Sequence, residues 1–191
     1  MTETPNPHIV DTDTLTGEMH PIRRCVLAIG SNKGERVNNL QGAVSSLADT
    51  PEVFLTAVSP VYETEPVDAP EGSRDFLNAV VLLDTTLSAR TLLERALAIE
   101  DAYGRDRSDG PNSPRTLDVD LVVVGDRRAN DEDLVLPHPR AHERAFVLAP
   151  WYDVEPDAEL LDHGPIAELL AKVSGDDGQA VTLRDDVALT L

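Results

Sequence analysis

The sequence has a single cysteine, Cys25, which lies inside the apolar run of residues 25–29. One cysteine excludes a disulfide within the chain and a metal site built from cysteines. No apolar stretch reaches the roughly 18 residues of a membrane helix. The N-terminus also lacks the basic and apolar regions of a secretory signal. We therefore expect a cytoplasmic protein that does not bind membranes.

Basic residues are scarce as well: the chain has 16 Lys and Arg against 35 Asp and Glu, a formal net charge of −19. This balance argues against nucleic acid as a partner, because nucleic acid requires a basic face. Yet several arginines gather in one part of the chain. They are Arg105, Arg107, Arg115, Arg127, Arg128, Arg140 and Arg144. Such a cluster in an acidic chain is typical of a polyphosphate site.

The 191 residues, 41% of them hydrophobic, are enough for one compact domain with a core. Residues 1–22 carry four acidic residues and no Lys or Arg, so we expect a flexible acidic tail. The domain proper is expected at residues 23–174. Residues 175–191 are expected to form a C-terminal extension.

Hydrophobic periodicity predicts alternating strands and helices within this domain. Strands are expected at 24–29, 53–64, 76–85 and 118–124, and a turn at 30–34. The expected helices have apolar stripes at Val37, Leu40, Val44 and Leu47, then at Leu92, Ala96 and Ile99 after a Ser88 cap, with two more near Phe146 and at 165–173. Because no P-loop lysine motif or dinucleotide-binding strand–glycine–helix unit is present, an α+β sandwich is favoured over a doubly wound sheet.

The segment Pro114–Val122 contains two aspartates at alternate positions of a predicted strand. Asp118 and Asp120 therefore share one face, while Leu117, Val119 and Leu121 are buried on the other. Two adjacent carboxylates repel each other unless a cation lies between them, and hard oxygen ligands suit Mg²⁺. Taken alone, such a triplet is more often a solvated strand end than a metal site.

Several motifs together resemble one known family, 6-hydroxymethyl-7,8-dihydropterin pyrophosphokinase of the folate pathway. The resemblance covers about residues 24–160. In chain order the motifs are Leu27–Asn32, Tyr62–Pro66, Asp75–Ala79, Ile99–Glu100 with Gly104–Arg105, Pro114–Asp120, Leu136–His138 and Arg144–Phe146. One departure is Pro111–Pro114, where the family usually carries an aromatic residue, often tryptophan.

The resemblance implies a monomeric α+β enzyme with a ferredoxin-like α/β sandwich, whose mainly antiparallel sheet is flanked by helices. Such an enzyme transfers pyrophosphate from ATP to the hydroxymethyl group of a reduced pterin, giving AMP and the pterin diphosphate. Its expected partners are these two small substrates. Two Mg²⁺ ions are expected between Asp118 and Asp120.

The resemblance also assigns roles to individual residues. The catalytic residues are expected to be Arg105, Arg115, Asp118 and Asp120. ATP is expected to contact Glu100, Arg105, Arg107, Arg115, His138 and Arg144. The pterin is expected to contact Thr64, Val67, Phe76, Asn78 and Phe146, with the two phenylalanines on either side of its ring.

Alternatives stay open at this point. Phe76 and Phe146 could be ordinary core residues, and Glu100 could solvate a helix end. Asn78 lies in the middle of an apolar strand, where a buried amide needs hydrogen-bond partners. The whole chain could instead be a catalytically impaired nucleotide- or pterin-binding regulatory module, or another Mg²⁺-dependent phosphoryl or nucleotidyl transferase.

Overall fold

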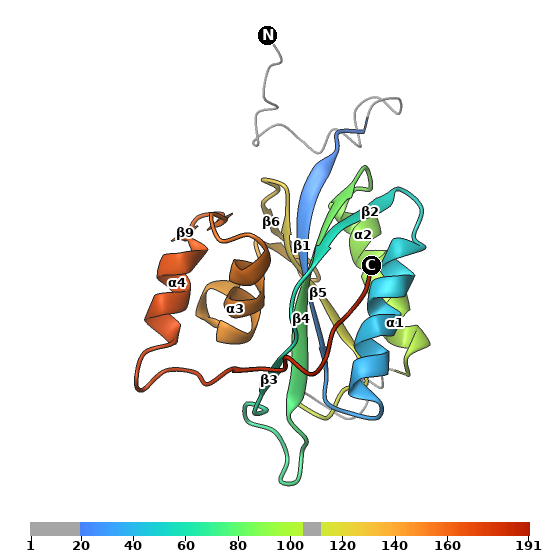
Figure 1. The fold of residues 1–191 in the computed structure, drawn as a ribbon. Coiled ribbons are helices and arrows are strands. Elements are labelled where there is room, and N and C mark those ends of the chain that lie inside the picture. The colour runs from blue at the N-terminus through green and yellow to red at the C-terminus, as the bar shows by residue number, and fades with distance from the viewer. Residues whose placement is uncertain (1–19, 105–111) are drawn as a thin grey trace.

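A computed structural model of the protein describes residues 20–104 and 112–191. Helices lie on both sides of a central sheet (Figure 1). The helices are α1 (Arg36–Ala48), α2 (Ala89–Ala102), α3 (Ala145–Val154) and α4 (Ile166–Val173), with a short 3-10 helix η2 (Ala141–Glu143). The strands are β1 (Arg23–Ser31), β2 (Val53–Val58), β3 (Tyr62–Thr64), β4 (Phe76–Thr85), β5 (Asp118–Val124), β6 (Ala129–Asn130), β7 (Val135–Leu136), β8 (Glu159–Leu160), β9 (Gly164–Pro165) and β10 (Thr182–Leu183).

The main sheet has the order β10-β3-β4-β1-β5, and β2 pairs with β4 beyond the end of β3. Every pairing in this sheet is antiparallel. The order β2-β4-β1-β5, with α1 between β1 and β2 and α2 between β4 and β5, is the arrangement of a ferredoxin-like fold. The expected α+β class and mainly antiparallel sheet are confirmed.

The two faces of the sheet carry separate apolar cores. On one face, residues of β1, β4 and β5 pack with α1 and α2, and Leu27 and Leu40 are fully buried there. On the other face, the strands pack with α3 and α4 around Trp151, which is 2% exposed. Figure 1 shows these two helical layers on opposite sides of the strands. Strands β1 and β4 are therefore buried on both faces over most of their length.

Most expected elements lie where the periodicity placed them. The Ser88 hydroxyl caps α2, accepting a 3.1 Å hydrogen bond from the Thr91 N–H. The expected strand at 118–124 and the last two helices are also present. Most of the expected acidic tail at residues 1–22 lies outside the described residues, as do Arg105 and Arg107 of the arginine cluster.

Three details of the prediction are wrong. Strand β1 continues through Ser31, so Gly30 is a strand residue rather than the start of a turn. Val37, expected on the buried face of α1, is 37% exposed: it shares the apolar stripe but lies in the first turn, before the buried residues, which begin at Asn39. The extended segment 53–64 is broken into β2 and β3. The five two-residue strands, β6 to β10, were not expected.

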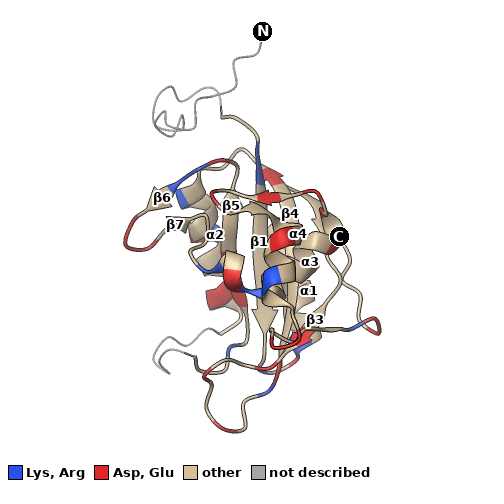
Figure 2. Ribbon diagram, turned by 90° about the vertical axis from the view of Figure 1, so that its left-hand side faces the viewer, with Lys and Arg blue, Asp and Glu red and all other residues tan. Residues whose placement is uncertain are grey.

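Positions of Asp and Glu, red on the ribbon of Figure 2, occur in both helices and loops, with the blue positions of Lys and Arg between them. Within the described ranges, no helix has the length and apolar character needed to cross a membrane. The lone thiol of Cys25 is fully buried in the first core, and burial raises its pKa to about 12. At neutral pH this thiol is therefore protonated and shielded.

Candidate active site

The central strands place polar side chains in two neighbouring rows on one sheet face. In the first row Asn78 of β4 and Asp118 of β5 both pair with Gly30 of β1. In the second row Asp120 is paired with Ala28. Residues directly opposite in antiparallel strands point to the same face. With neighbouring strands about 4.8 Å apart, Asn78 and Asp118 stand about 10 Å apart across a glycine.

The aspartates lie on the face opposite to the first apolar core. Val119 and Leu121 point into that core and are 3% and 5% exposed. The alternation expected for this strand is therefore confirmed. The Asp118 carboxylate forms a 3.1 Å ion pair with Arg115, and its side chain is only 15% exposed. Partial burial strengthens this pair relative to one on an open surface.

Two asparagines that were not among the predicted site residues, Asn32 and Asn39, hold the segment before β5. The Arg115 N–H donates to Asn32 Oδ1 at 2.6 Å, and the Asn32 N–H donates to the Arg115 carbonyl at 3.0 Å. Asn39 Nδ2 donates to the Thr116 carbonyl at 3.1 Å. Both asparagines are buried. In the sequence, the one sign that an asparagine holds this segment is the polar Asn39 beside the apolar stripe of α1.

Glu100 is buried against the outer edge of β5. It is 1% exposed, and its Oε1 accepts a 2.9 Å hydrogen bond from the N–H of Val119, the residue between the two aspartates. The alternative that Glu100 solvates a helix end is therefore wrong. The His138 N–H donates to the Val122 carbonyl at 2.8 Å, further along the same strand.

Arg144 lies near the two aspartates, and His138 lies near Arg144. Burial lowers the pKa of Arg144, while the charges of Asp120 and Asp118 raise it. Burial, with the neighbouring Arg144 and Arg140, lowers the pKa of His138 to about 4. His138 Nδ1 accepts a hydrogen bond from the Arg140 N–H at 3.2 Å, so the neutral ring carries its proton on Nε2.

On the β4 side, the Asn78 amide is buried and held in place. Its Nδ2 donates to Thr64 Oγ1 at 2.8 Å, and both residues are less than 10% exposed. A Cβ atom added to Gly30 would lie 3.2 Å from Asn78 Oδ1 and 3.6 Å from the Phe76 ring. The Asn78 carbonyl oxygen therefore lies over the bare backbone of β1, beside Phe76.

The remaining predicted residues are more dispersed. Phe76 and Phe146 are both half-buried, and the Arg144 guanidinium lies 5.4 Å from the centre of the Phe146 ring. Val67 is 70% exposed in the loop between β3 and β4. Asn112, at the position where the family usually has an aromatic residue, has φ of 63°, which asparagine tolerates well. Arg105 and Arg107 lie outside the described residues.

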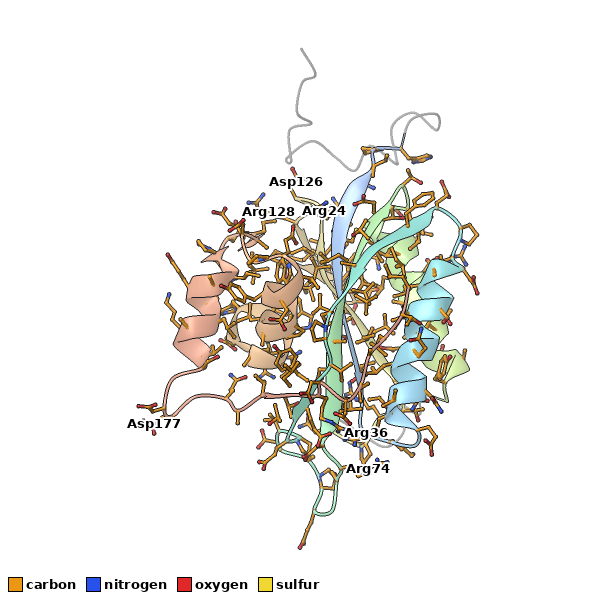
Figure 3. The ribbon with its side chains drawn as sticks, in the orientation of Figure 1. Arg24, Arg36, Arg74, Asp126, Arg128 and Asp177 are labelled. Carbon is orange, nitrogen blue, oxygen red and sulfur yellow. The ribbon has the colours of Figure 1, made fainter. Side chains whose placement is uncertain are left out.

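Arg128, part of the predicted arginine cluster, is directed elsewhere. It forms a bidentate pair with Asp162, with bonds of 3.1 and 2.8 Å. Figure 3 shows Arg128 and Arg24 at the upper end of the sheet, while Arg36 and Arg74 lie at the lower end, beside the loop that joins β3 to β4. The cluster is therefore split: Arg115 pairs with Asp118 and Arg144 lies near both aspartates, whereas Arg128 lies at the other end of the sheet.

The fold is shared with solved structures. A crystal structure of a Plasmodium falciparum HPPK-DHPS triple mutant with pteroate aligns with 83% of this chain, with a TM-score of 0.64 and 15% sequence identity. This chain spans 44% of that one. At this identity the similarity shows the fold alone.

Sequence comparison shows closer relatives. The chain is 40% identical over 173 residues to the 2-amino-4-hydroxy-6-hydroxymethyldihydropteridine pyrophosphokinase of Mycobacterium tuberculosis, covering 84% of this chain and 89% of that enzyme. It is 40% identical over 150 residues to the Pseudomonas aeruginosa enzyme, covering 78% and 91%. The family model of 7,8-dihydro-6-hydroxymethylpterin-pyrophosphokinase (HPPK) matches residues 26–156. The chain therefore belongs to this family of ATP-using pyrophosphokinases of folate biosynthesis.

Proposed function

We propose that the pyrophosphoryl transfer occurs over β1, between Asp118 and Asp120 on one side and Asn78 on the other. The relation of Asn78 and Asp118 to Gly30 carries this proposal. Both flank a residue without a side chain, on one sheet face. The pterin binds at the Asn78 side and the triphosphate at the aspartate side. The acceptor hydroxyl then lies between them.

The pterin site consists of Thr64, Phe76, Asn78 and Phe146, with backbone groups near Val67. Because Thr64 accepts one hydrogen bond from Asn78 Nδ2, the Asn78 carbonyl oxygen is left to accept an N–H from the polar edge of the ring. Phe76 and Phe146 supply flat apolar faces for stacking. An aromatic heterocycle with donors along one edge matches this combination.

The two carboxylates suit Mg²⁺. They provide hard oxygen ligands on one face, and Mg²⁺ commonly uses one or two carboxylates, with water and substrate phosphates completing its coordination. We propose that Asp118 and Asp120 hold two Mg²⁺ ions, which when bound neutralise charge on the triphosphate. The Arg115 guanidinium that now pairs with Asp118 is then available to phosphate oxygens.

The cationic and N–H groups around the aspartates form the phosphate site. Arg115 and Arg144 contribute fixed positive charge, and neutral His138 contributes its Nε2–H as a donor. Glu100 contributes by holding β5, and Arg105 and Arg107 are assigned to the phosphates from the family pattern. These groups lower the barrier by positioning and by stabilising charge that develops on the phosphoryl oxygens.

In the reaction the hydroxymethyl oxygen of the pterin attacks the β-phosphorus of ATP. The bond between that phosphorus and the oxygen bridging to the α-phosphate breaks, and AMP leaves with the bond's electron pair. The hydroxyl proton is released to solvent. The β- and γ-phosphoryl groups then remain joined on the pterin as its diphosphate.

The test mixes the protein with Mg²⁺, ATP and 6-hydroxymethyl-7,8-dihydropterin, and resolves AMP from ADP by chromatography. We expect AMP in equal amount to pterin diphosphate, and none without the pterin. ADP as the nucleotide product would overturn attack at the β-phosphorus. Normal AMP formation after chelation of Mg²⁺ would overturn the metal assignment.

We further propose that the enzyme acts as a cytoplasmic monomer, as the family resemblance and lone cysteine predict. Light scattering coupled to size-exclusion chromatography checks this. A mass near 20.7 kDa is expected across the concentration range of the assay. A mass of twice that value would contradict it.

A further inference from the structure

We propose that residues 175–191, named here the C-terminal strap, position both the phosphate side and the pterin side of the active site. This inference rests on the site assigned under the proposed function. The strap lies outside residues 26–156, the range that the family model matches. It leaves the end of α4 near Asp177 (Figure 3), passes β3 and ends beside α1 (Figure 1). It therefore joins the two helical layers around one edge of the sheet.

The phosphate side is held by Gln179. Its Oε1 accepts a 3.0 Å hydrogen bond from the Ala145 N–H, and its Nε2 donates to the Glu143 carbonyl. These two peptide groups flank Arg144. The N-cap position of α3, Arg144 itself, makes no capping side-chain bond, so Gln179 satisfies a first-turn N–H from outside the helix. Gln179 thus fixes the backbone from which the Arg144 guanidinium extends.

The pterin side is held by strand β10. Thr182 pairs with Glu63 and Leu183 pairs with Tyr62, and the Arg184 N–H donates to the Val61 carbonyl at 2.8 Å. Strand β3 is only three residues long, and its Thr64 accepts the hydrogen bond from Asn78. A strand as short as β3 is more stable when a second strand pairs with it. β10 supplies it on the side away from β4.

An ionic link reinforces this pairing. The Glu63 carboxylate contacts the guanidinium groups of Arg184 and of Arg36, the latter at 3.3 Å. Arg36 also donates to the Asp75 carbonyl at 2.8 Å, directly before Phe76. These three side chains are 17% to 28% exposed, so solvent screens them less than a surface pair. The strap is therefore linked to the start of β4 through Arg184, Glu63 and Arg36.

The far end of the strap is tied to α1. Gln41 Nε2 donates to the Thr190 carbonyl at 2.8 Å, and its Oε1 accepts the Thr190 N–H at 2.9 Å. Val187 and Leu189 pack against the first apolar core. The strap is thus anchored at both ends and in the middle, as a positioning element requires.

The test compares steady-state constants and binding affinities of the full-length chain with those of Gln179→Ala and Arg184→Gln. Loss of one ordinary hydrogen bond or ion pair is expected to change a kinetic or binding constant by about threefold to tenfold. We expect Gln179→Ala to raise the KM for ATP or lower kcat by this factor, with a smaller change in pterin affinity, because Phe146 directly follows Ala145. We expect Arg184→Gln to raise the KM for the pterin by this factor, with nucleotide affinity unchanged.

Arg24→Gln is the matched control. Arg24 pairs with Glu155 at 3.2 Å and with Asp84 at 3.9 Å, neither of them in the strap, and lies at the end of the sheet opposite to Arg36 (Figure 3). It is expected to leave all constants unchanged. Gln179→Glu keeps the acceptor for the Ala145 N–H, so its constants are expected to change less than those of Gln179→Ala. Thermal unfolding of every variant is measured in parallel.

Asp118→Ala in the same assays separates the two proposals. Full activity of Asp118→Ala would overturn the assigned site itself. Loss of activity in Asp118→Ala together with unchanged constants in both strap variants would overturn the strap alone. Equal changes for both substrates in step with a lower melting temperature would show only a general loss of stability, and would also overturn the positioning role.

Discussion

The Glu100 carboxylate accepts a hydrogen bond from the backbone N–H of Val119, so a buried acid on α2 holds the peptide between Asp118 and Asp120. Strand β5 is at the edge of the sheet, and among residues 20–104 and 112–191 no strand pairs with its outer side to satisfy this N–H. At this one position, the Glu100 carboxylate therefore accepts the hydrogen bond that the carbonyl of a neighbouring strand would otherwise accept. The two aspartates keep their spacing because the backbone between them is fixed.

Replacing Glu100 by alanine is expected to lower the free energy of unfolding by about 1–3 kcal/mol, the cost of a buried N–H without an acceptor. Glu100→Gln keeps a carbonyl oxygen at the same place and is expected to lose less. Chemical denaturation of the three proteins gives both values. Equal stability of wild type and Glu100→Ala would contradict the role of this bond.

Asp118→Ala and Asp120→Ala are each expected to lower kcat by orders of magnitude, because each removes a ligand of the proposed Mg²⁺ site. Stability should change little, since relief of the repulsion between two carboxylates offsets the loss of the Arg115 ion pair in Asp118→Ala. AMP formation over a range of Mg²⁺ concentrations, with unfolding curves beside it, measures both. Near-normal turnover in both variants would refute the metal assignment.

Thr64→Val removes the hydroxyl that accepts from Asn78 Nδ2 and keeps the shape of the side chain. The amide then loses its fixed orientation, and we expect the KM for the pterin to rise about threefold to tenfold, the value of one hydrogen bond. Thr64→Ser retains the hydroxyl and should behave like wild type. A pterin KM that is the same in Thr64→Val would show that Asn78 needs no such support.

Gly30→Ala places a methyl group 3.2 Å from Asn78 Oδ1, closer than ordinary van der Waals contact. Either the amide or β1 must shift, so weaker pterin binding is expected with nucleotide affinity unchanged. Titration calorimetry with each ligand measures the difference. Weaker nucleotide binding alone would place the pterin elsewhere.

The depressed pKa of His138, about 4 against about 6.5 in an unfolded chain, makes stability depend on pH. Between these values the unfolded chain binds the proton and the folded one does not. The free energy of unfolding is therefore expected to fall as pH is lowered from about 6.5 toward about 4. His138→Gln should show a weaker fall in that window. If the free energy of unfolding depended on pH in the same way in wild type and His138→Gln, the lowered pKa of His138 would be contradicted.

The elements with strong periodicity were predictable from sequence. The alternation around Asp118 follows from burial of one face of β5, and the Ser88 cap follows from the chemistry of helix starts. The two-residue strands have too few residues for any pattern to be visible. Val37 matches the helical stripe, yet that stripe cannot show where the sheet ends beneath the helix.

Part of the site also depended on contacts between distant segments. Asn32 and Arg115 are 83 residues apart in the chain and exchange two hydrogen bonds. No local pattern marks such a pair. Gln179 was missed for the same reason, since it reaches α3 from the C-terminal strap. In contrast, Asn78 was recognised because a buried amide in an apolar strand requires partners.

The burial of Cys25 has a practical consequence for following this enzyme in solution. The chain has no other cysteine, and this one is fully buried with a pKa of about 12. A cysteine introduced at the exposed Val67 would then be the only thiol open to a maleimide dye. Fluorescence from a single defined position in the loop between β3 and β4 could be recorded without first removing the native cysteine.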